Sequence, residues 1–301
     1  MKKISIVIVN FNGLPDTLEC LESVSQVSGS GFQKSVVIVD NGSNKKDAKE
    51  LKKIKGVKLL ESEVNTGFTG GNNLGIKHSL NEGADFILLL NNDTIVDREF
   101  IEKLIEASGK YSNAGIFTPK IYFAPGFEFH KERYSKQEKG RVIWSAGGVI
   151  DWDNVYGQNY GVDDTDIGQY EKNQETDFAT GAAMFVRREV FDEVGLLDEK
   201  LFLYLEDLEF SQRAKTGGWK IMFIPDAKVW HKVSQSSAIG GELNDYFITR
   251  NRLLFGMRYA PMRSKIALFK ESIRLLKHGR KWQRIGALDF YKGKFGQGSW
   301  K

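Results

Sequence analysis

The chain has 301 residues, of which 41% are hydrophobic and 27% charged, and its formal net charge is +4. This composition predicts a globular protein with a sizeable core, built as one α/β domain with an appendage or as two domains. It argues against nucleic-acid binding, because basic residues are concentrated only near the C-terminus.

The first half of the chain alternates predicted strands with predicted helices. Apolar runs predict strands over residues 4–9, 36–39, 57–60 and 86–90, with helices over residues 16–24 and 48–54. The first run is broken at Asn10 without a cleavage site, which favours a strand over a signal peptide. Helices between strands are typical of βαβ units and predict a parallel sheet with right-handed crossovers. The single cysteine, Cys20, allows no internal disulfide and favours a reducing compartment.

The fourth predicted strand, residues 86–90, is followed by Asn91, Asn92 and Asp93. The carboxyl ends of strands are where open α/β sheets bind ligands. A carboxylate there can hold Mg²⁺ or Mn²⁺ together with substrate phosphate oxygens, so Asp93 is a candidate metal ligand. The alternative is that Asn92, Asp93 and Thr94 cap a helix that begins near Asp97.

A glycine-rich stretch, residues 65–75, separates the third and fourth predicted strands. Its amide groups at a helix start could bind a phosphate, although a loop that happens to be rich in glycine would look the same. The stretch has neither the dinucleotide fingerprint nor the lysine of a P-loop. Asp40, which ends the second strand, either forms a turn or accepts a hydrogen bond from a nucleobase.

Residues 121–177 mix aromatic residues, glycines and the acidic patch Asp163, Asp164 and Asp166. The segment is either an acceptor groove, in which rings pack on a sugar or lipid, or an irregular excursion of the core. The acidic patch is either a solvated loop, which we favour, or a metal site. Beyond it, the pattern predicts strands over residues 180–186 and 221–224 and a helix over residues 188–194.

Glu206 and Asp207 lie within an otherwise apolar run, residues 201–210. Carboxylates are costly to bury unless they are paired or used, and one in an apolar pocket suits a general base. The two acids are equally suited to the N-terminus of a helix, where they meet the helix dipole favourably. Both interpretations can hold together.

Seven motifs follow one another within residues 4–237: Ser5–Asn12, Val39–Ser43, Asn65–Gly75, Leu90–Asp93, Thr180–Ala182, Glu206–Asp207 and Val229–His231. This ordered set resembles family 2 glycosyltransferases of the GT-A fold, and most of all their rhamnosyltransferase-like branch. The resemblance implies a Rossmann-like, mixed and mainly parallel α/β sheet flanked by helices. It also implies a catalytic domain of residues 1–237, with a nucleotide-sugar half (1–120) and an acceptor half (121–237), and a basic helical extension (238–301).

The resemblance also implies roles for individual residues. Asp207 matches the catalytic base, and Asp93 with His231 matches the ligands of a Mg²⁺ or Mn²⁺ ion, with Asn91 replacing the first Asp of the D-x-D motif. The residues implied for donor binding are Phe11, Asn12, Asp40, Asn65, Gly71, Asn72, Asn91 and Asn92. Those implied near the acceptor or the diphosphate are Trp144, Glu206, Arg250 and Asn251.

The implied activity is inverting transfer of a sugar from a nucleoside diphosphate to a hydroxyl of a glycan or lipid-linked acceptor, in cell-surface polysaccharide synthesis. dTDP-rhamnose is the favoured donor. The alternatives are another donor, such as a UDP-sugar, and a non-catalytic nucleotide- or sugar-binding module. A nucleotidyltransferase is disfavoured, because no glycine-rich basic loop follows the first strand.

The C-terminal part, from Tyr246 on, is predicted to be helical, basic and amphipathic. It either lies on a membrane surface or packs on the catalytic domain with a solvated basic face. No apolar run approaches the roughly 20 residues of a membrane-spanning helix. We therefore expect a cytoplasmic protein, peripheral on the inner face of the cell membrane in the first case, which could also form a homodimer.

Overall fold

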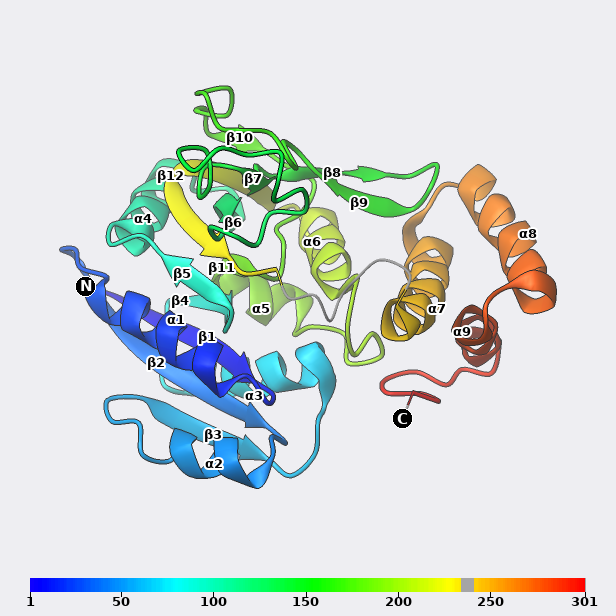
Figure 1. Ribbon diagram of the computed structural model, residues 1–301, viewed down its shortest axis with the longest axis horizontal. Coiled ribbons are helices and arrows are strands. Elements are labelled where there is room, and N and C mark those ends of the chain that lie inside the picture. The colour runs from blue at the N-terminus through cyan, green and yellow to red at the C-terminus, as the bar shows by residue number, and fades with distance from the viewer. Residues whose placement is uncertain (234–240, 301) are drawn as a thin grey trace.

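The computed structural model describes residues 1–233 and 241–300. Its first half contains β1 (Lys2–Asn10), α1 (Leu14–Gln26), β2 (Phe32–Asn41), α2 (Lys45–Leu51), β3 (Lys58–Ser62), α3 (Gly67–Asn81) and β4 (Phe86–Asn91). β1 pairs in parallel with both β2 and β4, and β2 pairs in parallel with β3. The predicted alternation of strands and helices is therefore confirmed, and so is the parallel pairing (Figure 1).

The next part adds strands that complete a ten-stranded sheet. It contains β5 (Thr94–Val96), α4 (Phe100–Lys110), β6 (Ala114–Phe123), β7 (Ile143–Ser145), β8 (Gly148–Asp151), β9 (Tyr156–Asn159), β10 (Gln174–Glu175), β11 (Ala183–Arg187), α5 (Arg188–Val194), α6 (Glu206–Thr216) and β12 (Lys220–His231). The main strand order is β10-β12-β6-β11-β4-β1-β2-β3, and β8 and β9 form a separate hairpin. β11 runs antiparallel between β4 and β6, which makes the sheet mixed, as predicted.

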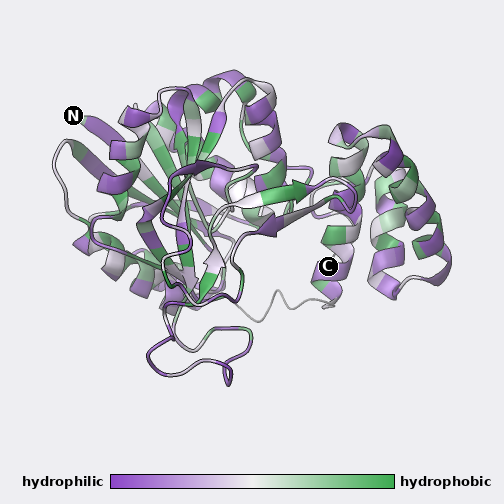
Figure 2. Ribbon diagram, turned by 90° about the horizontal axis from the view of Figure 1, so that it is seen from above, coloured by the Kyte–Doolittle hydropathy of each residue, from purple (hydrophilic) through white to green (hydrophobic). Residues whose placement is uncertain are grey.

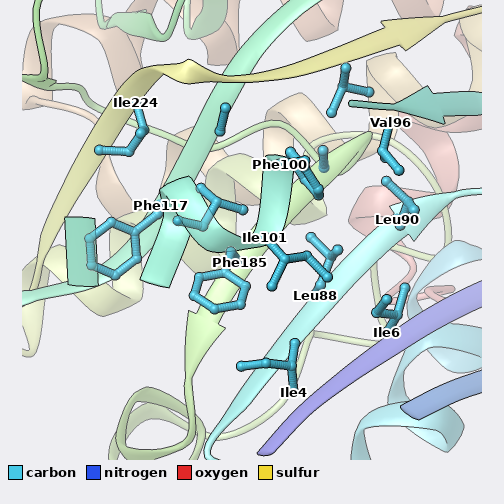
Figure 3. Packing of buried hydrophobic residues seen from close by; sticks show 14 of the residues in the cluster. Ile4, Ile6, Leu88, Leu90, Val96, Phe100, Ile101, Phe117, Phe185 and Ile224 are labelled. Carbon is cyan, nitrogen blue, oxygen red and sulfur yellow. The ribbon is translucent and has the colours of Figure 1, made fainter. Parts of the chain in front are cut away.

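The central strands are buried on both faces, which explains their nearly continuous apolar sequence. Because side chains alternate along a strand, Ile6 and Ile8 belong to one core cluster and Val7 belongs to the other. Figure 3 shows the first cluster, in which Phe100 and Ile101 of α4 cover the sheet. The sheet therefore holds the polar ends of its strands on a rigid platform.

The segment after β4 is a short strand and not the helix cap that one interpretation of the sequence offered. Residues Thr94–Val96 form β5, which pairs with β12, and α4 begins only at Phe100. The suggestion that Asn92, Asp93 and Thr94 cap a helix near Asp97 is therefore wrong. β-Branched residues favour extended backbone, and β12 offers this short strand a partner.

The predicted irregular segment begins inside a regular element. β6 (Ala114–Phe123) is buried throughout, so the boundary predicted at residues 120–121 falls within this strand. Asp166 is also buried, and it accepts hydrogen bonds from Lys120 Nζ at 2.9 Å and from the Tyr122 hydroxyl at 2.6 Å. The prediction of a solvated acidic loop is wrong for this residue, because its cationic partner lies far away in the sequence.

The C-terminal part contains α7 (Glu242–Tyr259), α8 (Met262–His278) and α9 (Lys281–Tyr291). The three helices stand beside the sheet, and the β8–β9 hairpin reaches toward them (Figure 2). Val155, at the hairpin tip, shares a buried cluster with Leu253 of α7 and Leu268 of α8. The predicted boundary at residues 237–238 lies outside the described residues. None of the helices that the structure describes has the length and apolar character needed to cross a bilayer.

Candidate active site

Three strands bring polar side chains to one edge of the sheet. Asn10 at the end of β1 is in register with Asp40 of β2, and Val9 of β1 is in register with Asn91 of β4. The strands run in the same direction, so their carboxyl ends meet. This edge is where an open α/β sheet binds ligands, as the sequence predicted.

The turns after β1 and β4 are joined by hydrogen bonds. Asn92 Nδ2 donates to the carbonyl of Gly13 at 3.2 Å and to Thr17 Oγ1 at 3.0 Å, while Thr17 Oγ1 donates to Asn10 Oδ1 at 2.7 Å. Asn92, predicted to bind the donor, thus holds the start of α1 against the end of β4. Sequence reasoning missed Thr17, whose only signal was its place in the first helical turn.

Phe11 and Asn12 lie in the turn beyond β1. The Phe11 ring is 47% exposed, which leaves a face open to a ligand. Asn12 adopts a left-handed conformation, with φ of 56°, and its Oδ1 accepts hydrogen bonds from the backbone and side chain of Asn44, both at 2.8 Å. Asn12 therefore fixes the turn that presents Phe11.

Asp40 is buried at the end of β2. Its Oδ1 accepts a hydrogen bond from the backbone amide of Ser43 at 3.0 Å, so the turn interpretation describes what this oxygen does. Among the described residues, Oδ2 has no hydrogen-bond partner. The arrangement leaves one carboxylate oxygen for a ligand and fixes its direction with the other.

Asn41, which follows Asp40, organises the glycine-rich stretch. Its Nδ2 donates to Asn65 Oδ1 at 3.1 Å and to the carbonyl of Gly67 at 2.9 Å, and its Oδ1 accepts from the amide and hydroxyl of Thr66. Sequence reasoning missed Asn41, although its place at a strand end was a usable signal. Asn65 and Asn41 together set the start of α3.

Two predicted donor residues in α3 contribute to packing. A Cβ atom on Gly71 would lie 2.8 Å from a methyl group of Val9, so glycine lets α3 approach β1 closely. Asn72 is buried, and its Nδ2 donates to the carbonyl of Phe68 at 2.9 Å within the helix. The structure therefore gives both residues a scaffold role beside the candidate site.

Asp93 and His231 lie side by side between the ends of β4 and β12. Asp93 Oδ1 and His231 Nε2 are 3.1 Å apart, and the Trp144 ring meets the His231 ring edge to face, with centroids 4.8 Å apart. The backbone amide of Lys232 also donates to the Asp93 carbonyl at 2.9 Å. The structure thus brings together the two predicted metal ligands and places Trp144 beside them.

The Asp93–His231 pair fits a divalent ion by its chemistry and spacing. A carboxylate oxygen suits Mg²⁺ or Mn²⁺, an imidazole nitrogen is a common metal ligand, and the two atoms lie 3.1 Å apart, close enough to share one ion. Over residues 1–233 and 241–300, no three His, Cys, Asp or Glu side chains form a metal-binding cluster. An ion held by this pair would therefore need oxygen ligands from substrate and water.

Glu206 and Asp207 form the first turn of α6, so the helix-terminus interpretation describes their place in the fold. Asp207 Oδ2 accepts a hydrogen bond from the backbone amide of Gly181 at 3.1 Å, and its Oδ1 accepts one from the amide of Leu208 at 2.8 Å. Glu206 is buried, and its Oε2 has no hydrogen-bond partner among the described residues. The two adjacent carboxylates therefore have different surroundings.

The pKa values of both carboxyl groups are raised. Burial, and then the negative charge of Asp207, raise the pKa of Glu206 to about 8. Burial also raises the pKa of Asp207 above its usual value, although the amides of Gly181 and Leu208 lower it in part. Burial thus favours the neutral form of Glu206, whereas Asp207 has hydrogen-bond donors that stabilise its ionised form.

Arg250 and Asn251, predicted near the acceptor or the diphosphate, are fully buried in α7. Asn251 Nδ2 donates to the carbonyls of Leu201, Leu203 and Tyr204 at 2.8, 2.8 and 2.9 Å. Arg250 Nη2 donates to the carbonyl of Leu201 at 3.0 Å. These contacts hold the loop that leads into α6, so both side chains direct polar groups to backbone atoms of the protein.

The fold is the GT-A fold. Solved structures with this fold include GalNAc-T7 with UDP, GalNAc and Mn²⁺ (TM-score 0.60, 18% identity, 97% of this chain and 57% of that one). They also include the mannosyltransferase PcManGT of Pyrobaculum calidifontis with GDP-Man and Mn²⁺ (TM-score 0.53, 14% identity, 96% of this chain and 74% of that one). Residues 5–195 match the model of glycosyl transferase family 2, and the chain belongs to this family.

Curated relatives include two named rhamnosyltransferases. The dTDP-rhamnosyl transferase RfbF of Shigella flexneri is 28% identical over 75% of this chain and 72% of its own length. The N-acetylglucosaminyl-diphospho-decaprenol L-rhamnosyltransferase of Mycobacterium tuberculosis is 24% identical over 77% of this chain and 76% of its own length. The low-salt glycan biosynthesis hexosyltransferase Agl10 of Haloferax volcanii is 28% identical over 70% of this chain, which spans 61% of that relative's length. The similarity supports the predicted rhamnosyltransferase-like branch.

Proposed function

We propose that this glycosyltransferase inverts the configuration of the transferred sugar, with Asp207 as the general base. The acceptor hydroxyl attacks the anomeric carbon from the face opposite the nucleoside diphosphate. Its proton passes to Asp207 as the new carbon–oxygen bond forms, and the bond to the diphosphate breaks with its electron pair. The observation that carries the proposal is the Asp207 carboxylate, fixed by two backbone amides at the start of α6.

The favoured donor is dTDP-rhamnose, because two relatives are named for rhamnosyl transfer and one of these for a dTDP-linked donor. In this proposal Phe11 lies against the base, and Asp40 Oδ2 accepts a hydrogen bond from an N–H group on its edge. A UDP-sugar is the alternative, since uracil offers the same N–H edge as thymine. The acceptor is a hydroxyl of a glycan or a lipid-linked sugar of the cell surface.

Asp93 and His231 would hold a Mg²⁺ or Mn²⁺ ion. Such an ion supplies positive charge to the leaving diphosphate. The protein itself contributes the fixed positions of the carboxylate and the imidazole, whose nitrogen and oxygen lie 3.1 Å apart. The ring of Trp144 packs against His231 and limits its rotation.

The outer face of α8 supports contact with a membrane. Met262, Ile266, Phe269 and Ile273 are each between 38% and 70% exposed and recur at intervals of four, three and four residues, which places them on one face. Basic residues flank this apolar stripe: Arg263, Lys265, Lys270, Arg274 and Lys277. We propose that the stripe docks on a bilayer rich in anionic lipids, where the acceptor would be anchored.

The decisive test of the proposed function is transfer with defined donors. Thermal unfolding with dTDP, UDP, GDP and CDP, each with and without Mn²⁺, identifies the base, because ligand at ~100 times its Kd adds about 2.7 kcal/mol of stability. The matching nucleotide sugars are then tested with rhamnosyl- and hexosyl-acceptors, and the anomeric configuration of the product is read by NMR. Retained configuration would refute the inverting mechanism, and failure of dTDP to bind would exclude dTDP-rhamnose.

A further inference from the structure

The loop before α6 has a strained backbone. Phe202, Tyr204 and Leu205 have φ angles of 65°, 70° and 64°, in the left-handed region that side chains other than glycine rarely adopt. Leu205 is the residue from which α6 starts, directly before Glu206. Strain of this kind persists only where the surrounding structure imposes it.

The α7 helix imposes this conformation through one carboxamide. Asn251 Nδ2 lies within 2.9 Å of three loop carbonyls, those of Leu201, Leu203 and Tyr204. An amide nitrogen has two hydrogens, so one hydrogen is shared between two of the three carbonyls, which converge on it from a loop with left-handed residues. The loop would lose this convergence in an ordinary extended conformation.

Arg250 fixes which way the carboxamide faces. Its Nε donates to Asn251 Oδ1 at 3.0 Å, so the Nδ2 atom must point to the loop. Its Nη1 donates to the carbonyl of Gly296 at 2.7 Å, and its planar guanidinium lies over the rings of Tyr246 and Phe247. The orientation of Asn251 is thus set by a fully buried cation.

The same loop contacts the glycine-rich helix on its other side. The carbonyl of Phe202 accepts a hydrogen bond from the amide of Thr69 at 3.2 Å, and a Cβ atom on Gly67 would lie 2.4 Å from that carbonyl. The Phe202 ring stacks on Phe247 of α7, with centroids 5.2 Å apart. The loop is therefore clamped between α7 and the start of α3.

We propose that Asn251, oriented by Arg250, is a positioning residue for transfer: it holds the loop 201–205 in its left-handed conformation and so places the Asp207 carboxylate against the Gly181 amide. The inference rests on the proposed role of Asp207 as the base. It assigns Asn251 no contact with donor or acceptor. Its effect belongs to the chemical step and not to donor binding.

The test uses the full-length Asn251→Asp variant, which keeps the shape of the side chain but turns an acceptor toward the three carbonyls. We expect kcat per folded enzyme to fall at least 10-fold, with the Kd for the nucleoside diphosphate within 3-fold of wild type. We also expect the acidic limb of the kcat–pH profile to move, because the surroundings of Asp207 change. A folded variant with wild-type kcat and an unmoved limb would overturn the proposal.

Two further variants keep the test decisive. Asp245 also lies on α7 but away from the loop. Asp245→Asn breaks its ion pair with Arg280 and should lower the Tm without moving the kcat–pH profile. If Asn251→Asp does not fold, Arg250→Lys removes the Nε contact and keeps the charge, and it should show the same loss of kcat with retained donor binding. Asp207→Asn separates the two ideas: if it transfers normally the proposed base is wrong, whereas normal transfer by Asn251→Asp alone refutes only the positioning role.

Discussion

The Asp207 carboxylate is tied to the Gly181 backbone amide, with Oδ2 and N 3.1 Å apart. The next residue, Ala182, accepts a hydrogen bond through its carbonyl from the amide of Asn91 at 3.0 Å. Two hydrogen bonds and one peptide unit thus connect α6 to the strand end that carries Asp93. The proposed base and metal ligand are held on one rigid framework, as positioning for catalysis requires.

Asp207→Asn should abolish transfer while leaving the donor bound. The carboxamide keeps the shape of the side chain and one of its two acceptor atoms but cannot take a proton, and general base catalysis is worth typically ~10²- to 10⁴-fold. Single-turnover transfer and nucleotide affinity measured on the same preparation would show this separation. A loss of both together would instead place Asp207 in donor binding.

Glu206→Gln should change stability more than chemistry. The folded-state pKa of Glu206, about 8, exceeds the usual glutamate value of 4.5, so the folded state binds more protons between these pH values. Stability therefore falls as pH rises through this window, by at most about 1.4 kcal/mol per pH unit for one group. The variant should flatten this decline in denaturant unfolding between pH 5 and 8, and an unchanged slope would contradict a neutral, buried Glu206.

Asp93→Asn and His231→Ala should each remove the metal-dependent part of nucleotide binding. The two side chains supply the protein's share of the proposed coordination, whereas Asp40, the proposed partner of the nucleobase, lies on another strand. Thermal shifts with the preferred nucleotide, with and without Mn²⁺, measure the two parts separately. If the Mn²⁺-dependent thermal shift persists in both variants, the ion binds at other residues.

Asp166→Ala should destabilise the fold by about 3 kcal/mol, because among the described residues it leaves the buried Lys120 ammonium with the exposed Glu171 alone as an acidic partner. Glu171→Gln is the matched control and should cost less than about 1 kcal/mol. Although burial raises the pKa of Asp166, hydrogen bonds from Lys120 and Tyr122 bring it below the usual aspartate value of 3.8. Its contribution is therefore present above pH 3.8 and is lost as pH falls further, which acid titration of the two variants would reveal.

Phe269→Glu should weaken binding to vesicles that contain phosphatidylglycerol, since it puts a charge in the middle of the apolar stripe on α8. Ile167→Glu, at an exposed apolar residue outside the C-terminal helices, is the control and should bind normally. Flotation with phosphatidylglycerol and with phosphatidylcholine alone measures the effect. A different result would assign the stripe to a second copy of the chain: a wild-type protein that does not bind vesicles but sediments as a dimer, which Phe269→Glu dissociates and Ile167→Glu does not.

The sequence predicted those parts of the fold whose signal is local. Buried parallel strands are apolar throughout, so β1, β2 and β4 were recognised together with the polar residues that end them. β6 was missed, because its Thr-Pro-Lys interruption hides a buried strand whose lysine is neutralised by Asp166. The positions of Asp93 and Asp207 could be predicted, but their roles stay predictions.

Contacts between distant parts of the chain could not be predicted. Asn251 lies 47 to 50 residues from the carbonyls that it binds, and no periodicity records such a pairing. The resemblance suggested a ligand contact for Arg250 and Asn251, whereas their buried polar atoms are used by the protein backbone. Burial and hydrogen-bond geometry had to be seen before this role could be proposed.

The backbone of Gly296 has a consequence for how the protein matures. Its carbonyl accepts a hydrogen bond from Arg250 and its amide donates to the carbonyl of Lys200 at 2.8 Å, so this residue completes the support of the loop 201–205. During synthesis the sheet can form long before residue 296 leaves the ribosome. We therefore expect a nascent chain that already binds nucleotide to remain inactive until its C-terminal segment has docked, so that competence to bind precedes competence to react.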